Sequence, residues 1–160
     1  MSIKGLSGGP LGTSQTLQEM RKLTREGCRD PVVIQVASSL VSQVPQYDRR
    51  GEIIALHGFV RDAIRYTSDP IDFELVRTPR AVLEMRVGDC DDKSILLAAL
   101  LRCIGRPARF VAVQMRGQCC FSHVYVETPM SNRWICLETI KPVPAGWAPS
   151  GVIKRMVRHI

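Results

Sequence analysis

The stretch VGDCDDKSILLAALLRCIG, residues 87–105, decides how this chain is organised. Its second half, 94–104, is apolar nearly all round, which is typical of a helix buried on every side. Gly105 can adopt a left-handed helix cap, and Pro107 cannot continue a helix. The first half places a thiol, Cys90, among aspartates where that helix should begin. The sequence therefore predicts a central buried helix with a cysteine at its N-terminus.

Helical and strand-like patterns flank this stretch. Apolar residues recur at helical spacing in three earlier segments, at about 17–27, 33–44 and 51–66. Asp30 and Pro31 form a helix-start signal before the second segment. After the central helix come three strand-like runs, at 109–115, 122–128 and 133–138. The predicted class is α+β, with a helical N-terminal part and a long irregular connection at 67–88.

The composition is that of one globular domain. The chain has 160 residues, of which 45% are hydrophobic and 23% charged. The expected boundaries are a flexible Gly/Ser-rich arm at 1–15, the domain at 16–140 and a Pro-rich, basic extension at 141–160. The net charge is +7, but basic residues are spread along the chain without a nucleic-acid-binding motif. This argues against nucleic acid as the partner.

The cysteines and the N-terminus favour a reducing compartment. No segment resembles a signal peptide or a membrane span, so a cytoplasmic location is expected. Six cysteines are present without the spacing of a disulfide framework. Cys119 and Cys120 lie near His123 and Cys136, but the spacing is not that of a zinc site, and an exposed turn is expected there. The acids around Cys90 suit the first turn of a helix, so neither a metal nor a cofactor is expected.

Three residues could do chemistry together: Cys90, His123 and Glu138. A thiol needs a base to become a thiolate, and the base needs a third group to fix its tautomer. If the last two strands form a hairpin with its turn centred on Met130 and Ser131, His123 lies opposite Glu138 on one face. The expected contacts are Nδ1 of His123 with Glu138 and Nε2 of His123 with the Cys90 sulfur.

The pKa of Cys90 is subject to opposing effects. The helix dipole and a protonated His123 favour the thiolate, whereas the three aspartates of the motif raise the thiol pKa. The prediction is that the histidine outweighs them, so that the pKa lies below the roughly 8.5 of a free cysteine. The backbone N–H of Cys90 is a natural oxyanion donor, and a second donor would have to come from the connection at 67–88.

Three motifs resemble the transglutaminase-like superfamily. They are GDCDDK with LLRCIGRPARFV (88–93 and 100–111), similar to the family's cysteine core, FSHVYVE (121–127), similar to its histidine strand, and WICLET (134–139), similar to its acid strand. The resemblance covers about 51–140 and implies a papain-like fold with the nucleophile helix packed on an antiparallel sheet. It also implies acyl transfer through a thioester, although the family includes inactive members. The family usually has Asp where this chain has Glu138.

Two functions follow as expectations. The leading one is a thiol-dependent acyl-transfer enzyme acting on protein or peptide, in which Cys90 attacks, His123 serves as base and then acid, and Glu138 orients His123. The N-terminal pattern and the Pro-Ala-Gly-Trp segment at 144–147 also resemble small phage-encoded members. That likeness implies the alternative, a head or tail assembly protein with a vestigial site, docked on neighbouring subunits. His57 is predicted to be a packing or surface residue.

Overall fold

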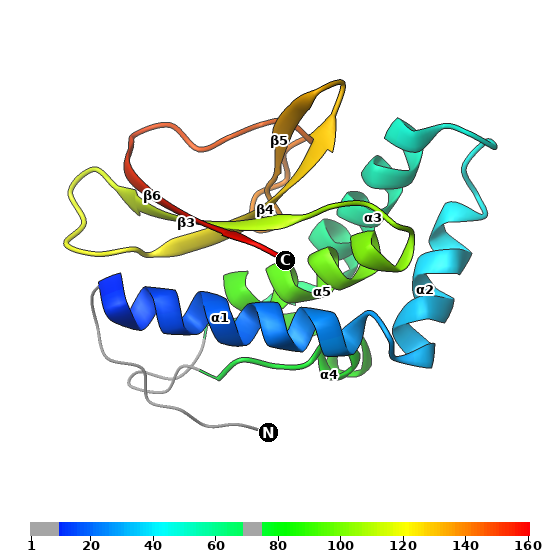
Figure 1. The fold of residues 1–160 in the computed structure, drawn as a ribbon, viewed down its shortest axis with the longest axis horizontal. Helices are drawn as coiled ribbons and strands as arrows, with labels where there is room; N and C mark the ends of the chain where they lie inside the picture. The colour runs from blue at the N-terminus through cyan, green and yellow to red at the C-terminus, as the bar shows by residue number, and fades with distance from the viewer. Residues whose placement is uncertain (1–9, 69–74) are drawn as a thin grey trace.

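The fold combines five helices with six strands in a computed structural model that describes residues 10–68 and 75–160 (Figure 1). The helices are α1 (Pro10–Gly27), α2 (Pro31–Val41), α3 (Arg49–Ala63), α4 (Pro79–Met85) and α5 (Cys90–Cys103). The strands are β1 (Arg65–Tyr66), β2 (Val87–Gly88), β3 (Arg109–Met115), β4 (His123–Met130), β5 (Arg133–Leu137) and β6 (Val152–His159). The α+β class predicted from the sequence is confirmed.

Four strands form an antiparallel sheet in the order β5-β4-β3-β6, and the helices gather on one of its faces (Figure 1). The two short strands β1 and β2 form a separate parallel pair in which Tyr66 lies opposite Gly88. This pair ties the chain that leads into Cys90 to the end of α3. In the described part of the chain, no helix has both the length and the apolar character needed to cross a bilayer.

Helix α5 is the centre of the core. It packs against α1, α2, α3, α4 and β4, and every residue from Asp92 to Leu101 is buried. This explains why its apolar residues show no preferred face. Gly105 follows the helix with a φ of 73°, and the N–H of Arg106 donates to the Leu101 carbonyl at 2.9 Å. The predicted buried helix, its glycine stop and its packing on an antiparallel sheet are confirmed.

The C-terminal segment differs from the expectation. Residues 141–160 were expected to be an extension, but β6 lies within them and pairs with β3 along its length. Basic residues at exposed positions hid this strand from the sequence pattern, a composition common on sheet edges because charge discourages pairing with other chains. The sheet, and with it the domain, therefore includes residues 152–159.

The N-terminal boundary also moves. Residues 10–15 of the expected arm belong to α1, which starts at Pro10. Proline suits the first helical position because its fixed φ matches the helix and its missing N–H needs no partner there. Residues 1–9, the rest of the expected arm, lie outside the described part of the chain.

Candidate active site

The β4–β5 hairpin brings His123 and Glu138 together. Its two turn residues, Ser131 and Asn132, have φ angles of 50° and 64°, as in the type I′ turns that suit antiparallel hairpins. This turn lies one residue further along the chain than expected, so the observed register differs from the predicted one by two residues. Because side chains alternate with a period of two, such a difference leaves each side chain on the same face of the sheet. His123 and Glu138 are therefore not directly opposite each other, but they still share one face of the sheet, as predicted.

The imidazole and the carboxylate are in direct contact. Nε2 of His123 lies 2.6 Å from Oε2 of Glu138. The predicted contact is thus present, but it uses Nε2 rather than the expected Nδ1. In a neutral histidine whose Nε2–H donates to a carboxylate, Nδ1 is the nitrogen that can accept a proton.

Glu138 is buried yet ionised. Its residue is 1% exposed, and burial alone would raise the pKa of the carboxyl group. The hydrogen bond from His123 and backbone N–H groups of Ile140 and Lys141 act in the opposite direction and leave the pKa below its ordinary value. One of these bonds joins the Ile140 N–H to Glu138 Oε1 at 2.7 Å. A negative charge is therefore held at a fixed place beside the imidazole.

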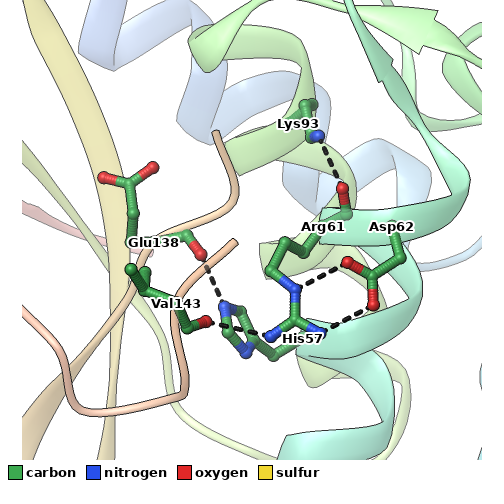
Figure 2. Close-up of polar contacts among 6 residues, drawn as sticks. All are labelled: His57, Arg61, Asp62, Lys93, Glu138 and Val143. Atoms are coloured by element: carbon green, nitrogen blue, oxygen red, sulfur yellow. Dashed lines mark hydrogen bonds and ion pairs between the residues drawn. The ribbon is translucent and has the colours of Figure 1, made fainter. Parts of the chain in front are cut away.

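Helix α3 holds the backbone that carries this carboxylate. Nε2 of His57 lies 2.6 Å from the Glu138 carbonyl oxygen, and Nη1 of Arg61 donates to the Val143 carbonyl at 2.9 Å. Figure 2 shows the Glu138 carbonyl pointing toward His57 while its carboxylate points away. Burial lowers the pKa of His57, so its ring is neutral near pH 7 and Nε2–H is the donor. We call His57 and Arg61 the α3 clamp.

Sequence reasoning missed the polar role of His57. It was expected to pack or face solvent, and it is indeed buried, but it also bonds the residue that carries the acid. The available signal was weak: His57 and Arg61 are four residues apart, a spacing that places polar side chains on one helix face. Nothing local in the sequence indicates that this face meets residues 138–143.

The end of α3 is joined to α5 by a buried lysine. Nζ of Lys93 donates to the carbonyl oxygen of Arg61 at 3.2 Å (Figure 2). It also donates to the carbonyl oxygen of Ile64 at 2.7 Å. A cation suits the negative end of a helix dipole. Burial nevertheless lowers the pKa of Lys93 to about 8. Asp62 pairs with Arg61 through two contacts of 2.7 and 2.6 Å, which fixes the guanidinium of the α3 clamp.

The start of α5 places Cys90. Asp89 is the N-cap, and its side chain and that of Asp92 each accept a backbone N–H of the other residue, which forms a capping box. Gly88 is required here because a Cβ at that position would lie 2.7 Å from the Cβ of Asp92. Asp92 also accepts the backbone N–H of Arg77 at 2.8 Å and pairs with its guanidinium. Two of the motif's aspartates therefore serve the architecture of the helix start.

The Cys90 thiol lies against the histidine strand. Ser94, one helical turn after Cys90, donates its hydroxyl to the Val124 carbonyl at 3.4 Å, and the backbone of Val124 also hydrogen-bonds with the Cys90 sulfur. Residues four apart share a helix face, so this face of α5 meets β4 at the residue next to His123. The thiol itself donates to Asp91 Oδ1 at 3.6 Å, rather than to the imidazole.

The prediction that the pKa of Cys90 lies below that of a free cysteine is wrong. Burial raises the pKa of the thiol well above its ordinary value, and the charges of Asp91 and Asp89 raise it further. The backbone hydrogen bond with Val124 acts the other way but does not offset them. The helix dipole does not compensate for burial beside two carboxylates. Cys90 is therefore a protonated thiol in this arrangement.

Metal ligation is not indicated by the described residues. Within 10–68 and 75–160, no group of three or more histidine, cysteine or acidic side chains is arranged to hold a metal ion. Cys119 and Cys120 are both exposed, in the loop between β3 and β4.

A family model described as the transglutaminase-like superfamily matches residues 36–139, a range that includes Cys90, His123 and Glu138. No curated protein sequence matches the chain. Solved structures with a similar fold include the following three. A candidate protease from Parabacteroides distasonis has a TM-score of 0.64 at 14% identity, covering 81% of this chain and 26% of its own. A candidate cysteine protease from Cytophaga hutchinsonii has a TM-score of 0.62 at 18% identity, covering 82% and 43%.

The third structure is calcium-bound LapG from Legionella pneumophila, with a TM-score of 0.61 at 16% identity, covering 87% of this chain and 81% of its own. At these identities the likeness concerns the fold alone. The chain spans about a quarter of the first structure and less than half of the second. The family model nevertheless covers well over half of this chain, and the fold agrees with it. This chain belongs to the transglutaminase-like superfamily.

Proposed function

We propose that this protein is a thiol-dependent acyl-transfer enzyme that acts on protein or peptide substrates, as a protease, an amidase or a crosslinking enzyme. The observation that carries the proposal is the 2.6 Å contact between His123 Nε2 and the ionised Glu138 carboxylate. His123 is the first residue of β4, and the backbone of the next residue, Val124, hydrogen-bonds with the Cys90 sulfur. A carboxylate, an imidazole and a thiol in this order supply the three roles of a catalytic triad. The chain's superfamily and its likeness to candidate proteases support the same assignment.

In the proposed reaction, Cys90 Sγ attacks the acyl carbonyl while its proton passes to Nδ1 of His123. Because burial keeps the thiol protonated, attack and proton transfer are coupled rather than starting from a preformed thiolate. Glu138 fixes the tautomer and stabilises the imidazolium. His123 then protonates the leaving amine, and water or an acceptor amine takes the acyl group from the thioester. The proposed setting is the cytoplasm, where a reducing environment preserves the thiol.

The proposed oxyanion donor is the backbone N–H of Cys90. It is the first residue of α5, and the N–H groups of a first helical turn have no acceptor inside the helix. Such donors stabilise the negative oxygen that develops as the thiol adds to a carbonyl. The second donor was expected from the connection at 67–88, of which residues 69–74 lie outside the described part of the chain.

Acylation by an activated ester tests the proposal. Trypsin cleaves after Arg86 and Lys93, so Cys90 is the single cysteine of peptide 87–93. With p-nitrophenyl acetate, we expect a burst of p-nitrophenolate equal to the enzyme concentration, and an acetyl group on that peptide after acid quenching. The control is the same protein unfolded in urea. Acetylation of Cys90 no faster than in the unfolded chain would contradict the proposal.

A second candidate is a protein that keeps the fold without the chemistry. The buried, protonated thiol, hydrogen-bonded to Asp91, favours this reading because it is not primed for attack. The absence of acylation in a folded protein would select it. The more specific expectation of a phage head or tail component has no support from the family model or from the three structures, and it stays a prediction.

A further inference from the structure

Two adjacent cysteines, Cys119 and Cys120, are exposed in the loop between β3 and β4, and the proposed reaction uses neither. The Cys119 thiol donates toward the Cys120 sulfur across 3.5 Å. Since an S–S bond is about 2.05 Å long, the two sulfurs need to approach by about 1.5 Å to become bonded. Exposure gives a small oxidant access to both.

The loop that carries the pair is held at both ends and leads directly into the candidate site. On one side, Nε2 of Gln114 donates to the Gln118 carbonyl at 2.8 Å. On the other side, the N–H of Ser122 donates to the Val113 carbonyl at 3.1 Å. The residue after Ser122 is His123, the first residue of β4. A change in the backbone of the pair is therefore confined to the few residues between Gln118 and Ser122. Ser122 directly precedes His123, the proposed base.

We propose that Cys119 and Cys120 form a redox-labile modification site, which closes to a vicinal disulfide and shifts His123. The oxidant is a low-molecular-weight disulfide such as oxidised glutathione. One thiolate attacks it, which releases one reduced glutathione and leaves a mixed disulfide. The second thiolate displaces the other glutathione and forms the S–S bond. The protein loses two protons and two electrons, and the oxidant becomes two molecules of reduced glutathione.

The geometry makes this disulfide easily reversible. Neighbouring Cα atoms are about 3.8 Å apart, whereas disulfides usually join Cα atoms roughly 4.4–6.8 Å apart. Closing the ring therefore strains the peptide, and strained or exposed disulfides are the ones most readily reduced. The chemistry of the pair is independent of the function proposed above; its consequence for catalysis rests on that function.

Mass spectrometry tests the modification directly. Trypsin cleaves after Arg116 and Arg133, and peptide 117–133 contains Cys119, Cys120 and no other cysteine. The protein should carry Cys90→Ser, so that the nucleophile thiol cannot react, and should be equilibrated with oxidised glutathione, quenched with acid and alkylated. The expected peptide is unalkylated and lighter than the reduced one by two hydrogen atoms, and a modest excess of reduced glutathione restores it. A doubly alkylated peptide, or glutathione adducts without ring closure, would overturn the proposal.

The effect on His123 has its own readout. Imidazole resonances in nitrogen-edited NMR spectra, assigned with His123→Ala, should shift on oxidation and return on reduction. The matched control carries Cys119→Ser and Cys120→Ser together and should show no shift under the same treatment. A disulfide that forms while the His123 resonances stay unchanged would overturn the coupling to the candidate site. Neither readout requires an active enzyme, so failure here is distinguishable from failure of the acyl-transfer proposal.

Discussion

The two halves of the candidate site are built in different ways. His123 and Glu138 are brought together by a hairpin, and the α3 clamp bonds the backbone carbonyls of Glu138 and Val143. Cys90 depends on a helix cap, and its surroundings favour the uncharged thiol. The acid–base half is thus assembled and charged, whereas the nucleophile half is placed but not activated. In the proposed reaction, the sulfur should therefore lose its proton only as the acyl group arrives.

Removing the base should have the largest effect. His123→Ala deletes the proposed acceptor of the thiol proton, and acylation of Cys90 by p-nitrophenyl acetate should fall by roughly 10⁴-fold. The measurement is the burst rate. His159→Ala is the matched control, since that imidazole packs edge-on against Trp134 in the sheet, away from the proposed chemistry. Equal burst rates in the two variants would show that the acid–base half is not used.

Removing the charge of the acid should come next. Glu138→Gln keeps the size of the side chain but cannot stabilise an imidazolium, and the acylation rate should fall by roughly 10²- to 10⁴-fold. Glu138→Asp tests reach instead of charge, because it shortens the side chain by one methylene. If Glu138→Gln acylates as fast as the wild type, the 2.6 Å contact is structural rather than catalytic.

Loosening the α3 clamp should have a smaller effect on the same half. His57→Phe removes the donor to the Glu138 carbonyl and should lower kcat by about 10- to 100-fold through misplacement of the acid, with KM little changed. His57→Gln places an amide N–H near the position of Nε2 and should recover most of the loss. If kcat falls equally in both variants and in proportion to their loss of stability, His57 is only a packing residue and its hydrogen bond does not position the acid.

The same histidine predicts a pH dependence of stability. The pKa of His57 is lowered in the folded protein by burial, so between that pKa and the ordinary value near 6.5 the unfolded chain binds more protons. The free energy of unfolding should therefore decrease as the pH falls below about 6.5. Urea unfolding of the wild type and of His57→Gln across pH 5–8 isolates this contribution, which the variant should lack. Parallel curves would contradict it.

The nucleophile half offers the smallest change, and it is a gain. Asp91→Asn removes a charge that raises the pKa of Cys90, so iodoacetamide labelling of Cys90 at pH 7 should accelerate by up to about tenfold. In the wild type, the labelling rate should keep rising through alkaline pH because the thiol pKa is raised. Glu26→Gln, on the exposed side of α1, controls for the loss of one negative charge. An unchanged rate would mean that burial alone keeps the thiol protonated.

The sequence was most informative where a local pattern determined the structure. The buried helix, the cysteine at its first position and the glycine that ends it could be predicted, because a helix that is apolar on all sides and its end signals can be recognised from adjacent residues. The contact between His123 and Glu138 could be predicted despite a misplaced turn. Side chains alternate between the two faces of a sheet, so a register error of two residues leaves each side chain on its face. Strand β6 was missed because edge charges concealed its alternation.

The rest of the site depends on contacts between distant segments. The hydrogen bond from His57 to the Glu138 carbonyl joins helix α3 to the segment after β5, and no local sequence pattern connects these two segments. The pKa of Cys90 was misjudged because the sequence displays the helix start and the aspartates but not the burial that dominates the shift.

The direction in which the buried Lys93 points bears on whether the protein could acylate itself. Lys93 lies one turn from the sulfur that would carry a thioester. With a pKa of about 8, about a tenth of it is a free amine at pH 7, the form that attacks acyl groups, which is far more than for an ordinary lysine. Its Nζ is instead directed into the carbonyl end of α3, while Cys90 meets β4. The Lys93 amine, although close to Cys90 in sequence, is thus directed away from a thioester on Cys90 and does not become its acyl acceptor. An acyl group formed on Cys90 would be left for water or for an amine that arrives from another molecule.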